Sequence, residues 1–247
     1  MTAIVDDNDG GNKEMPLTAH IGELRYVLIR CGCVVIACSI PCGIYWKDIF
    51  DVIVFHSLKL CGPAVHIIYT APAETVMLSV KIALICGFIL ASPIVFQQMW
   101  SFVSPALYKK EKFWTLLTAL ASTVCFLLGI AFSCYLLPLA LKFLTEFAAG
   151  TLEPFFKVDE YLSFLLKLSL AFGFAFQLPV IAFVLSKIGL INHKFLLRNF
   201  RYAIVLIFIV AAILTPPDVL SQIMLAAPLL VLYALSILIS FLARKKE

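Results

Sequence analysis

Long apolar runs separated by short polar stretches make up most of this chain. An α-helix needs about 20 mainly apolar residues to cross a bilayer whose hydrocarbon core is about 30 Å thick. Apolar runs of this kind, one of them shorter, lie at Tyr26–Trp46, Thr75–Gln98, Phe113–Pro138, Tyr161–Ser186, Tyr202–Leu214 and Val219–Leu242. The pattern predicts an all-α polytopic membrane protein with six transmembrane helices.

The fifth of these runs is too short for an ordinary span. Tyr202–Leu214 would form a helix of only about 20 Å at ~1.5 Å per residue. The sequence L-T-P-P-D-V-L-S-Q then leads into the sixth run at Val219. We expect a hairpin of short fifth and sixth spans, around which the bilayer thins or flanking residues snorkel.

Prolines interrupt several of the apolar runs, at Pro93, Pro138, Pro179 and Pro228. A proline inside a span frees a backbone carbonyl and bends the helix, and neighbouring helices can compensate. Bent spans favour a concave bundle over a straight one. No internal repeat is visible, so the sequence gives no support to a transporter built from duplicated halves.

The composition agrees with a membrane protein. Hydrophobic residues make up 62% of the 247 positions and charged residues 14%, whereas soluble domains have roughly 25% charged residues. Of the eight cysteines only Cys61 lies in a clearly aqueous stretch, and the others lie in or beside apolar runs, where cysteine acts as a small hydrophobe. We expect no disulfide, no metal site, no other cofactor and no nucleic-acid partner.

Lysine and arginine are distributed unevenly over the two predicted sides of the membrane. The N-terminal segment, the second-to-third loop, the fourth-to-fifth loop and the C-terminus hold most of them, and the opposite side holds Lys47, Lys59, Lys142 and Lys157. By the positive-inside rule both termini are cytoplasmic. The chain thus divides into a disordered tail at 1–14, a six-span domain at 15–242 and a basic tail at 243–247.

Two long connections lie on the predicted outer side, at Lys47–Glu74 and Ala140–Glu160. Their apolar runs are too short to span, so we expect short surface helices that cap the outer face. Lys81 and Lys167 lie inside spans near this side. We favour snorkelling to the interface for both, and a functional role is the alternative.

Four polar side chains stand out in the apolar pattern. Gln177, deep in the fourth span, should find a partner within the bundle, because an unpaired amide in hydrocarbon costs about 2 kcal/mol or more. Asp218 is either an N-cap of the sixth helix, which we favour, or an acid that faces a partner. Thr215 and Gln222 form a small polar patch beside it.

Two acids stand among basic residues on the predicted cytoplasmic side. Glu23 lies two residues before Arg25 at the entrance of the first span, and Glu111 lies in K-K-E-K between the second and third spans. From these residues alone, both acids balance nearby positive charges at the interface.

Four sequence motifs occur in order along the chain. They are H-I-G-E-L-R at 20–25, Q-x-W-x-F-x-x-P-A-L-Y-x-x-E at 98–111, F-G-F-A-F-Q-L-P-V at 172–180, and L-T-P-P-D-x-x-S-Q at 214–222 followed by A-A-P-L-L. In this order and spacing they resemble the signature of the TatC family, the membrane receptor of twin-arginine protein export. The family commonly has glutamate where this chain has Gln177, so a hydrogen-bonding role is expected here and a role for an ionisable carboxylate is not.

The resemblance implies a cytoplasmic site for the arginine pair of a signal peptide. Guanidinium groups suit carboxylates because paired N–H donors match two oxygens. The aromatic residues of the site also fit an interfacial aromatic belt, and both interpretations can hold together. The implied signal-peptide residues are Glu23, Arg25, Phe102, Leu107, Tyr108 and Glu111, and the implied groove or partner contacts are Gln177, Thr215, Asp218 and Gln222.

The sequence is therefore interpreted as the receptor and core subunit of a twin-arginine translocase in the inner membrane. The resemblance implies several copies per complex, TatA-like and TatB-like single-span partners, contact with lipid, and export of folded proteins by the proton-motive force. The alternative is a small-solute secondary transporter, which is disfavoured because only Gln177 is polar near mid-membrane. No enzyme is expected, because H-E-x-x-H, G-x-S-x-G and phosphate-loop motifs are absent from the sequence.

Overall fold

The computed structural model describes residues 17–61, 66–68, 70–107, 112–148, 155–215 and 219–243. The predicted tail at 1–14 lies outside these residues, as does the basic tail beyond residue 243. The elements are α1 (Leu17–Ile44), α2 (Trp46–Cys61), β1 (His66–Ile68), α3 (Pro72–Leu107), α4 (Lys112–Ala148), β2 (Phe155–Lys157), α5 (Val158–Ala175), α6 (Leu178–Ile188), α7 (His193–Arg198), α8 (Phe200–Leu214) and α9 (Val219–Ala243).

The described residues are nearly all helical, as predicted. Five stretches are long and apolar enough to cross a membrane, at Gly22–Ile44, Ala73–Val103, Phe113–Leu139, Val158–Ile188 and Ser221–Ala243. The sixth apolar helix, α8, has 15 residues and is short, as expected. The expectation of a short sixth span is wrong, because α9 continues for 25 residues, or about 37 Å at ~1.5 Å per residue.

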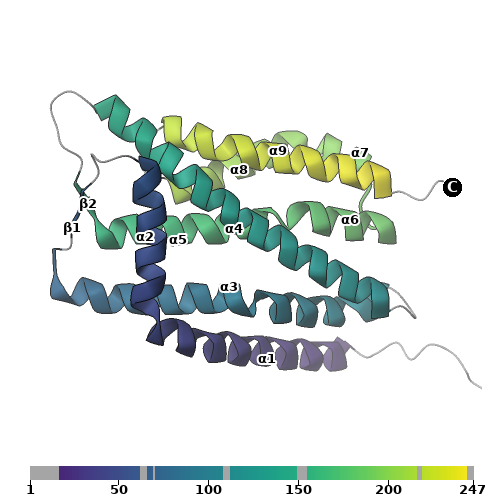
Figure 1. Cartoon of the computed structure of the whole chain (residues 1–247). Coiled ribbons are helices and arrows are strands. Elements are labelled where there is room, and N and C mark those ends of the chain that lie inside the picture. Colours follow the sequence, from purple (N-terminus) through teal and green to yellow (C-terminus); the bar gives the residue numbers. More distant parts are fainter. Residues whose placement is uncertain are drawn as a thin grey trace, which may run out of the picture.

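Two ends of the bundle can be distinguished in Figure 1. The beginning of α1 and the end of α9 lie at one end, which we call the terminal end, and β1 and β2 lie at the other, which we call the strand end. The helix α4 crosses the bundle obliquely, and α2 runs across α3 almost at a right angle. The shared end for both termini agrees with an even number of spans.

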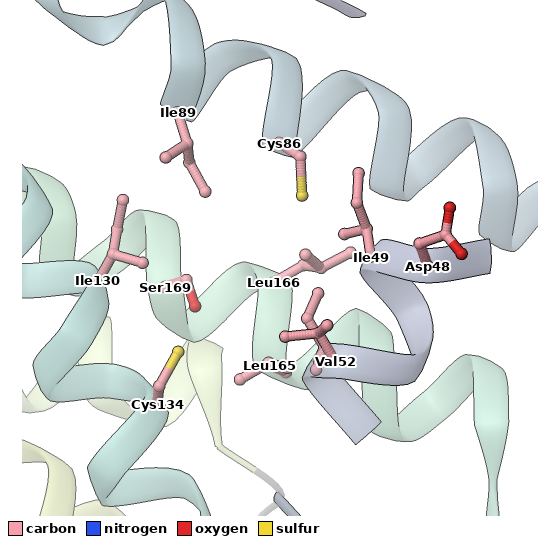
Figure 2. A pocket seen from close by; sticks show the side chains of 11 residues that line it. Asp48, Ile49, Val52, Cys86, Ile89, Ile130, Cys134, Leu165, Leu166 and Ser169 are labelled. Atoms are coloured by element: carbon pink, nitrogen blue, oxygen red, sulfur yellow. The ribbon is translucent and has the colours of Figure 1, made fainter. Parts of the chain in front are cut away.

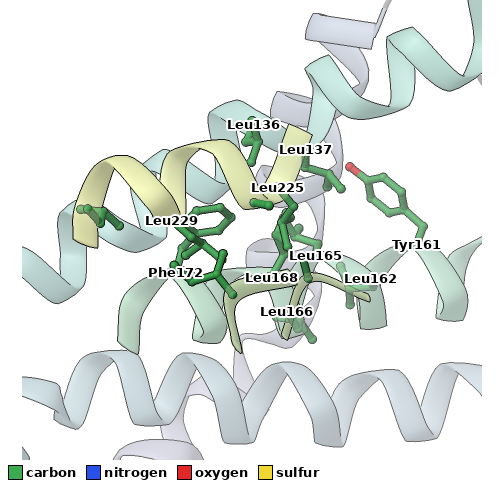
Figure 3. Close-up of a cluster of buried hydrophobic side chains, with 14 of the residues drawn as sticks. Leu136, Leu137, Tyr161, Leu162, Leu165, Leu166, Leu168, Phe172, Leu225 and Leu229 are labelled. Atoms are coloured by element: carbon green, nitrogen blue, oxygen red, sulfur yellow. The ribbon is translucent and has the colours of Figure 1, made fainter. Parts of the chain in front are cut away.

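A cluster of buried hydrophobic side chains joins α3, α4, α5, α8 and α9. Figure 3 shows side chains from α4, α5 and α9 converging on one another, and Leu137, Leu162 and Phe172 among them are almost fully buried. The helix α5 supplies the most buried of these surfaces, whereas α1 lies at the margin, with only 11% of its span buried. Since lipid covers exposed apolar surface in a bilayer, the exposed face of α1 suits a membrane environment.

The fourth span is interrupted where the sequence places a proline. The residues expected to form one span are divided into α5 and α6 by a break at Phe176 and Gln177. Pro179 lies in the first turn of α6 and has no N–H, so the α5 ladder cannot continue through it. The bend predicted at this proline is therefore present. The helix α6 ends at Gly189, whose φ of +85° favours glycine.

The two long connections at the strand end differ from each other. The first contains the expected surface helix, α2, which has 16 residues. The second contains β2, which pairs in parallel with β1 so that Ile67 faces Phe156. This strand pair was not predicted, because three-residue strands leave no periodic pattern in the sequence.

An ion pair joins α3 to α5 near the strand pair. The Lys81 ammonium donates to Asp159 Oδ1 at 2.6 Å and to Ser163 Oγ at 2.9 Å. Snorkelling, which we favoured for Lys81, stays a prediction, and the structure adds an acidic partner for the ammonium on the neighbouring helix. Sequence could not show this partner, because Asp159 is far from Lys81 along the chain.

The helices α1 and α3 touch at a glycine. A Cβ added to Gly87 would lie 2.2 Å from Ser39 Oγ and 2.6 Å from Ser39 Cα. Glycine is therefore required for this close backbone approach. The Ser39 hydroxyl donates to Val35 O within α1, so its hydrogen bond is satisfied inside its own helix.

Candidate functional site

The packing of α1 on α3 places two of the sequence-predicted site residues at one level. Ser39 meets Gly87, and further toward the terminal end the Arg30 guanidinium donates to Gln98 Oε1 at 3.4 Å. Since the two helices run antiparallel, continuing this register toward the start of α1 brings Glu23 level with the turn that contains Phe102. The association of these two motifs in one site stays a prediction, and the helix register is compatible with it.

The exposure of these residues fits a surface that faces water or headgroups. Glu23 and Arg25 are exposed on α1, and Phe102 is half-buried on α3. Leu107 ends α3, but its side chain lies outside the described part of the structure. Tyr108 and Glu111 also lie outside the described residues, so their positions relative to Glu23 stay a prediction.

A cation–π contact fixes the start of α4 at the same end. The Lys187 ammonium, in the last turn of α6, lies 3.3 Å from the centre of the Trp114 ring and 5.6 Å from that of Phe183. Such contacts contribute about 0.5–2 kcal/mol, depending on how far the pair is desolvated. This contact, which the sequence does not reveal, joins α6 to the helix that begins directly after Glu111.

Ser122 on α4 connects three helical segments. Its hydroxyl accepts a hydrogen bond from Trp100 Nε1 of α3 at 2.7 Å, and its carbonyl accepts one from Gln177 Nε2 at 2.8 Å. Gln177 is only 6% exposed. The prediction that this amide finds a partner inside the bundle is confirmed. Trp100 thus has a hydrogen-bond partner on α4. The one hint of this partner in the sequence is that a serine interrupts the apolar run of that helix.

The described polar side chains near the α8–α9 turn make their hydrogen bonds within the hairpin. Thr215 is buried and donates its hydroxyl to Ala211 O, and the half-buried Gln222 donates its amide to Phe208 O at 3.0 Å. Asp218 lies outside the described residues, so its capping role stays a prediction. The apolar side chains of Ile213 and Val219, on either side of the turn, are much more exposed than the patch itself.

The described residues contain no group of three or more His, Cys, Asp or Glu side chains that could hold a metal ion. The described polar groups of the site make hydrogen bonds within or between helices, or are exposed at the terminal end. Chemically, the arrangement offers an exposed carboxylate on a lipid-flanked helix and a set of buried hydrogen bonds that hold α3, α4 and the α5–α6 break together.

Comparisons with known proteins agree with this architecture. Residues 19–228 match the family described as Sec-independent protein translocase protein (TatC). The TatC protein of Aquifex aeolicus is 42% identical over 239 residues, which covers 94% of this chain and 98% of the relative. The Helicobacter pylori protein is 42% identical over 226 residues, which covers 91% and 88%.

A solved structure shows the same fold. The crystal structure of a twin-arginine translocase receptor, TatC, superposes with a TM-score of 0.83 at 40% identity and covers 91% of this chain and 99% of that one. These likenesses give no support to the small-solute transporter considered as the alternative. The family identified from four sequence motifs is confirmed, and the chain belongs to the TatC family of Sec-independent protein translocase proteins.

Proposed function

We propose that this chain binds twin-arginine signal peptides at its terminal end and is the receptor subunit of a twin-arginine translocase. The observation that carries the proposal is the α1–α3 register, which brings Glu23 level with the turn of Phe102 in a chain of the TatC family. A solved relative is described as a twin-arginine translocase receptor. The terminal end is cytoplasmic in this proposal, because the positively charged loops lie there.

The recognition chemistry is that of carboxylates and guanidinium groups. Glu23 and Glu111 each accept N–H donors from one arginine of the pair, and Arg25, Phe102, Leu107 and Tyr108 shape the site around them. A bidentate carboxylate–guanidinium pair discriminates arginine from lysine, because an ammonium cannot present two parallel donors. This gives the site a preference for arginine that a general negative charge would not give.

The remaining polar residues act in assembly. Gln177 holds the break between α5 and α6 against α4 through its hydrogen bond to Ser122. The hairpin of α8 and α9 is the contact region for TatA-like and TatB-like single-span proteins, with Thr215, Asp218 and Gln222 at its turn. Several copies then assemble in the inner membrane, and the proton-motive force drives folded cargo across.

The test is crosslinking of the purified full chain to a photoreactive signal peptide. The peptide that carries two arginines should crosslink near Glu23, and a matched peptide with two lysines should not. Equal crosslinking of both peptides would show that the site recognises charge alone. No crosslinking of either peptide, in a sample whose thermal unfolding is normal, would contradict the proposed receptor function.

A further inference from the structure

A large apolar cleft lies between α2 and the bundle. It has a volume of about 410 Å³ and is bounded by α2, α3, α4 and α5. Its lining consists of Asp48, Ile49, Val52, Ile53, Cys86, Ile89, Ile130, Cys134, Leu165, Leu166 and Ser169. Figure 2 shows the aliphatic and thiol side chains around the hollow, with Asp48 at its edge on α2. The volume falls in the range of roughly 300–1,000 Å³ that is common for ligand sites.

The interior of the cleft offers almost nothing to a polar ligand. Its one polar side chain at depth, Ser169, shares a hydrogen bond of 2.8 Å with Ser133. Water in a cavity needs two to four polar partners, and apolar cavities stay dry. An occupant must therefore be apolar, and an empty cleft would forfeit dispersion contacts along its whole lining.

The cleft lies at the depth of hydrocarbon. Ile89, Ile130 and Leu166 are all well inside candidate membrane spans, in α3, α4 and α5. The cleft is partly open, so that molecules of a surrounding bilayer can enter it. The surrounding lipid is the apolar material available at this depth.

The shape of the lining favours a flexible chain over a helix. Four helices contribute the lining side chains. A hydrocarbon chain can bend to follow this irregular surface, whereas an α-helix with its side chains is a rigid body about 10–12 Å across.

The charges at the edge of the cleft indicate which headgroup would be placed there. Asp48 is exposed in the first turn of α2, and the exposed Lys47 stands beside it. A headgroup that carries both an ammonium and a phosphate complements both charges, whereas an anionic headgroup without an amine complements Lys47 alone.

We propose that the cleft between α2 and the bundle binds one acyl chain of a phospholipid with an amine-bearing headgroup, such as phosphatidylethanolamine. The lipid enters from the leaflet at the strand end, and its ammonium lies at Asp48. It fills the space under α2 and fixes the position of that helix against α3, α4 and α5.

The first experiment fills the cleft. Ile130→Trp places a large side chain into it, and the matched control Leu128→Trp places the same side chain on the exposed face of α4, where Leu128 is 54% exposed. The full chain is purified in mild detergent, and bound phospholipid is counted by native mass spectrometry. The wild type and Leu128→Trp should retain one phospholipid, and Ile130→Trp should retain at least tenfold less. A second filling variant, Ile89→Phe, is used if Ile130→Trp fails to fold.

The second experiment tests the headgroup. In nanodiscs of equal phosphatidylethanolamine and phosphatidylglycerol, Asp48→Asn should reduce the preference for the amine-bearing lipid at least threefold. Retention of the same lipid by both filling variants would overturn the proposal, as would an unchanged preference in Asp48→Asn. Loss of twin-arginine peptide binding in the filling variants, with lipid retention unchanged, would assign the cleft to the peptide instead.

Discussion

At the scale of single residues, the polar groups of the site form two sets, one exposed to a ligand and one that stabilises the bundle. Glu23 and Arg25 face outward at the terminal end, where a charged ligand can reach them. Inside the bundle, Gln177 Nε2 donates to the backbone carbonyl oxygen of Ser122 at 2.8 Å. Substitutions in the first set should change ligand affinity, and substitutions in the second should change stability.

The outward acids are predicted to recognise the arginine pair. Glu23→Gln and Glu111→Gln should each weaken signal-peptide binding about ten- to a hundredfold, because a hydrogen bond to a charged group contributes roughly 1.5–3 kcal/mol. Glu160→Gln is the matched control, since this acid is exposed at the strand end. Peptide affinity is measured by fluorescence anisotropy. Wild-type affinity in both single variants and in the double variant would remove these residues from the site.

Gln177 is predicted to act by donating its amide proton. Gln177→Leu should lower the free energy of unfolding by about 0.6–2 kcal/mol, the magnitude typical of interhelical hydrogen bonds in membranes, and should reduce transport. Gln177→Glu should retain transport, because a protonated carboxyl can donate to Ser122 O in the same way. Thermal unfolding in detergent and an export assay give the two measurements. A Leu variant with full stability and transport would leave the bond without a role.

At the scale of elements, close backbone contact between α1 and α3 sets the register on which the site depends. The contact relies on Gly87, beside which no Cβ fits, whereas a Cβ at Gly32 of α1 would meet nothing within 4 Å. The two glycines therefore form a matched pair for substitution.

Gly87→Ala is predicted to push α1 away from α3. Its Cβ would meet the backbone of Ser39, and relief of such overpacking costs about 1–3 kcal/mol. Gly32→Ala should leave stability unchanged or slightly raised, because alanine is the better helix former. Unfolding in detergent gives the stability, and the signal-peptide affinity should fall for Gly87→Ala alone. Equal behaviour of the two variants would mean that the register does not depend on this contact.

The helices could be predicted from the sequence, and their partners could not. Apolar length and proline position gave the six spans and the bend before Pro179. The sixth span is longer than predicted, because the shortness of the fifth apolar run does not apply to its neighbour, α9. The bonds of Trp100 and Lys81 depend on the rotation of helices about their axes, which a uniformly apolar helix does not encode. The family motifs indicated Glu23 and Gln177, but only the structure shows that Gln177 bonds to Ser122.

At the scale of the whole molecule, α8 is much shorter than the five candidate membrane spans of the described residues. The helix α8 has 15 residues, or about 22 Å at ~1.5 Å per residue, against a hydrocarbon core of about 30 Å. The cost is a fraction of a kcal/mol per ångström of mismatch. A partner with a similarly short apolar helix would share that deformation and gain by lying there.

Single-span partners are therefore predicted to crosslink from the hairpin. Photoreactive side chains at Thr215 and Gln222 should capture a TatB-like protein, and one at Leu117, on the exposed face of α4, should not. Because Thr215 is buried, the stronger crosslinks are expected from Gln222. Capture from Leu117 alone would place the docking surface on α4.

The pairing of β1 with β2 also constrains how the chain is made. Residues 66–68 leave the ribosome well before residues 155–157, and two membrane spans, α3 and α4, must be inserted in between. Until then β1 has an unpaired edge, and the pair can close only if both connections have reached the same side of the membrane. Parallel pairing over such a separation is slow to form. We therefore expect this small sheet to close late in folding, and only in chains whose second and third spans crossed the membrane in opposite directions.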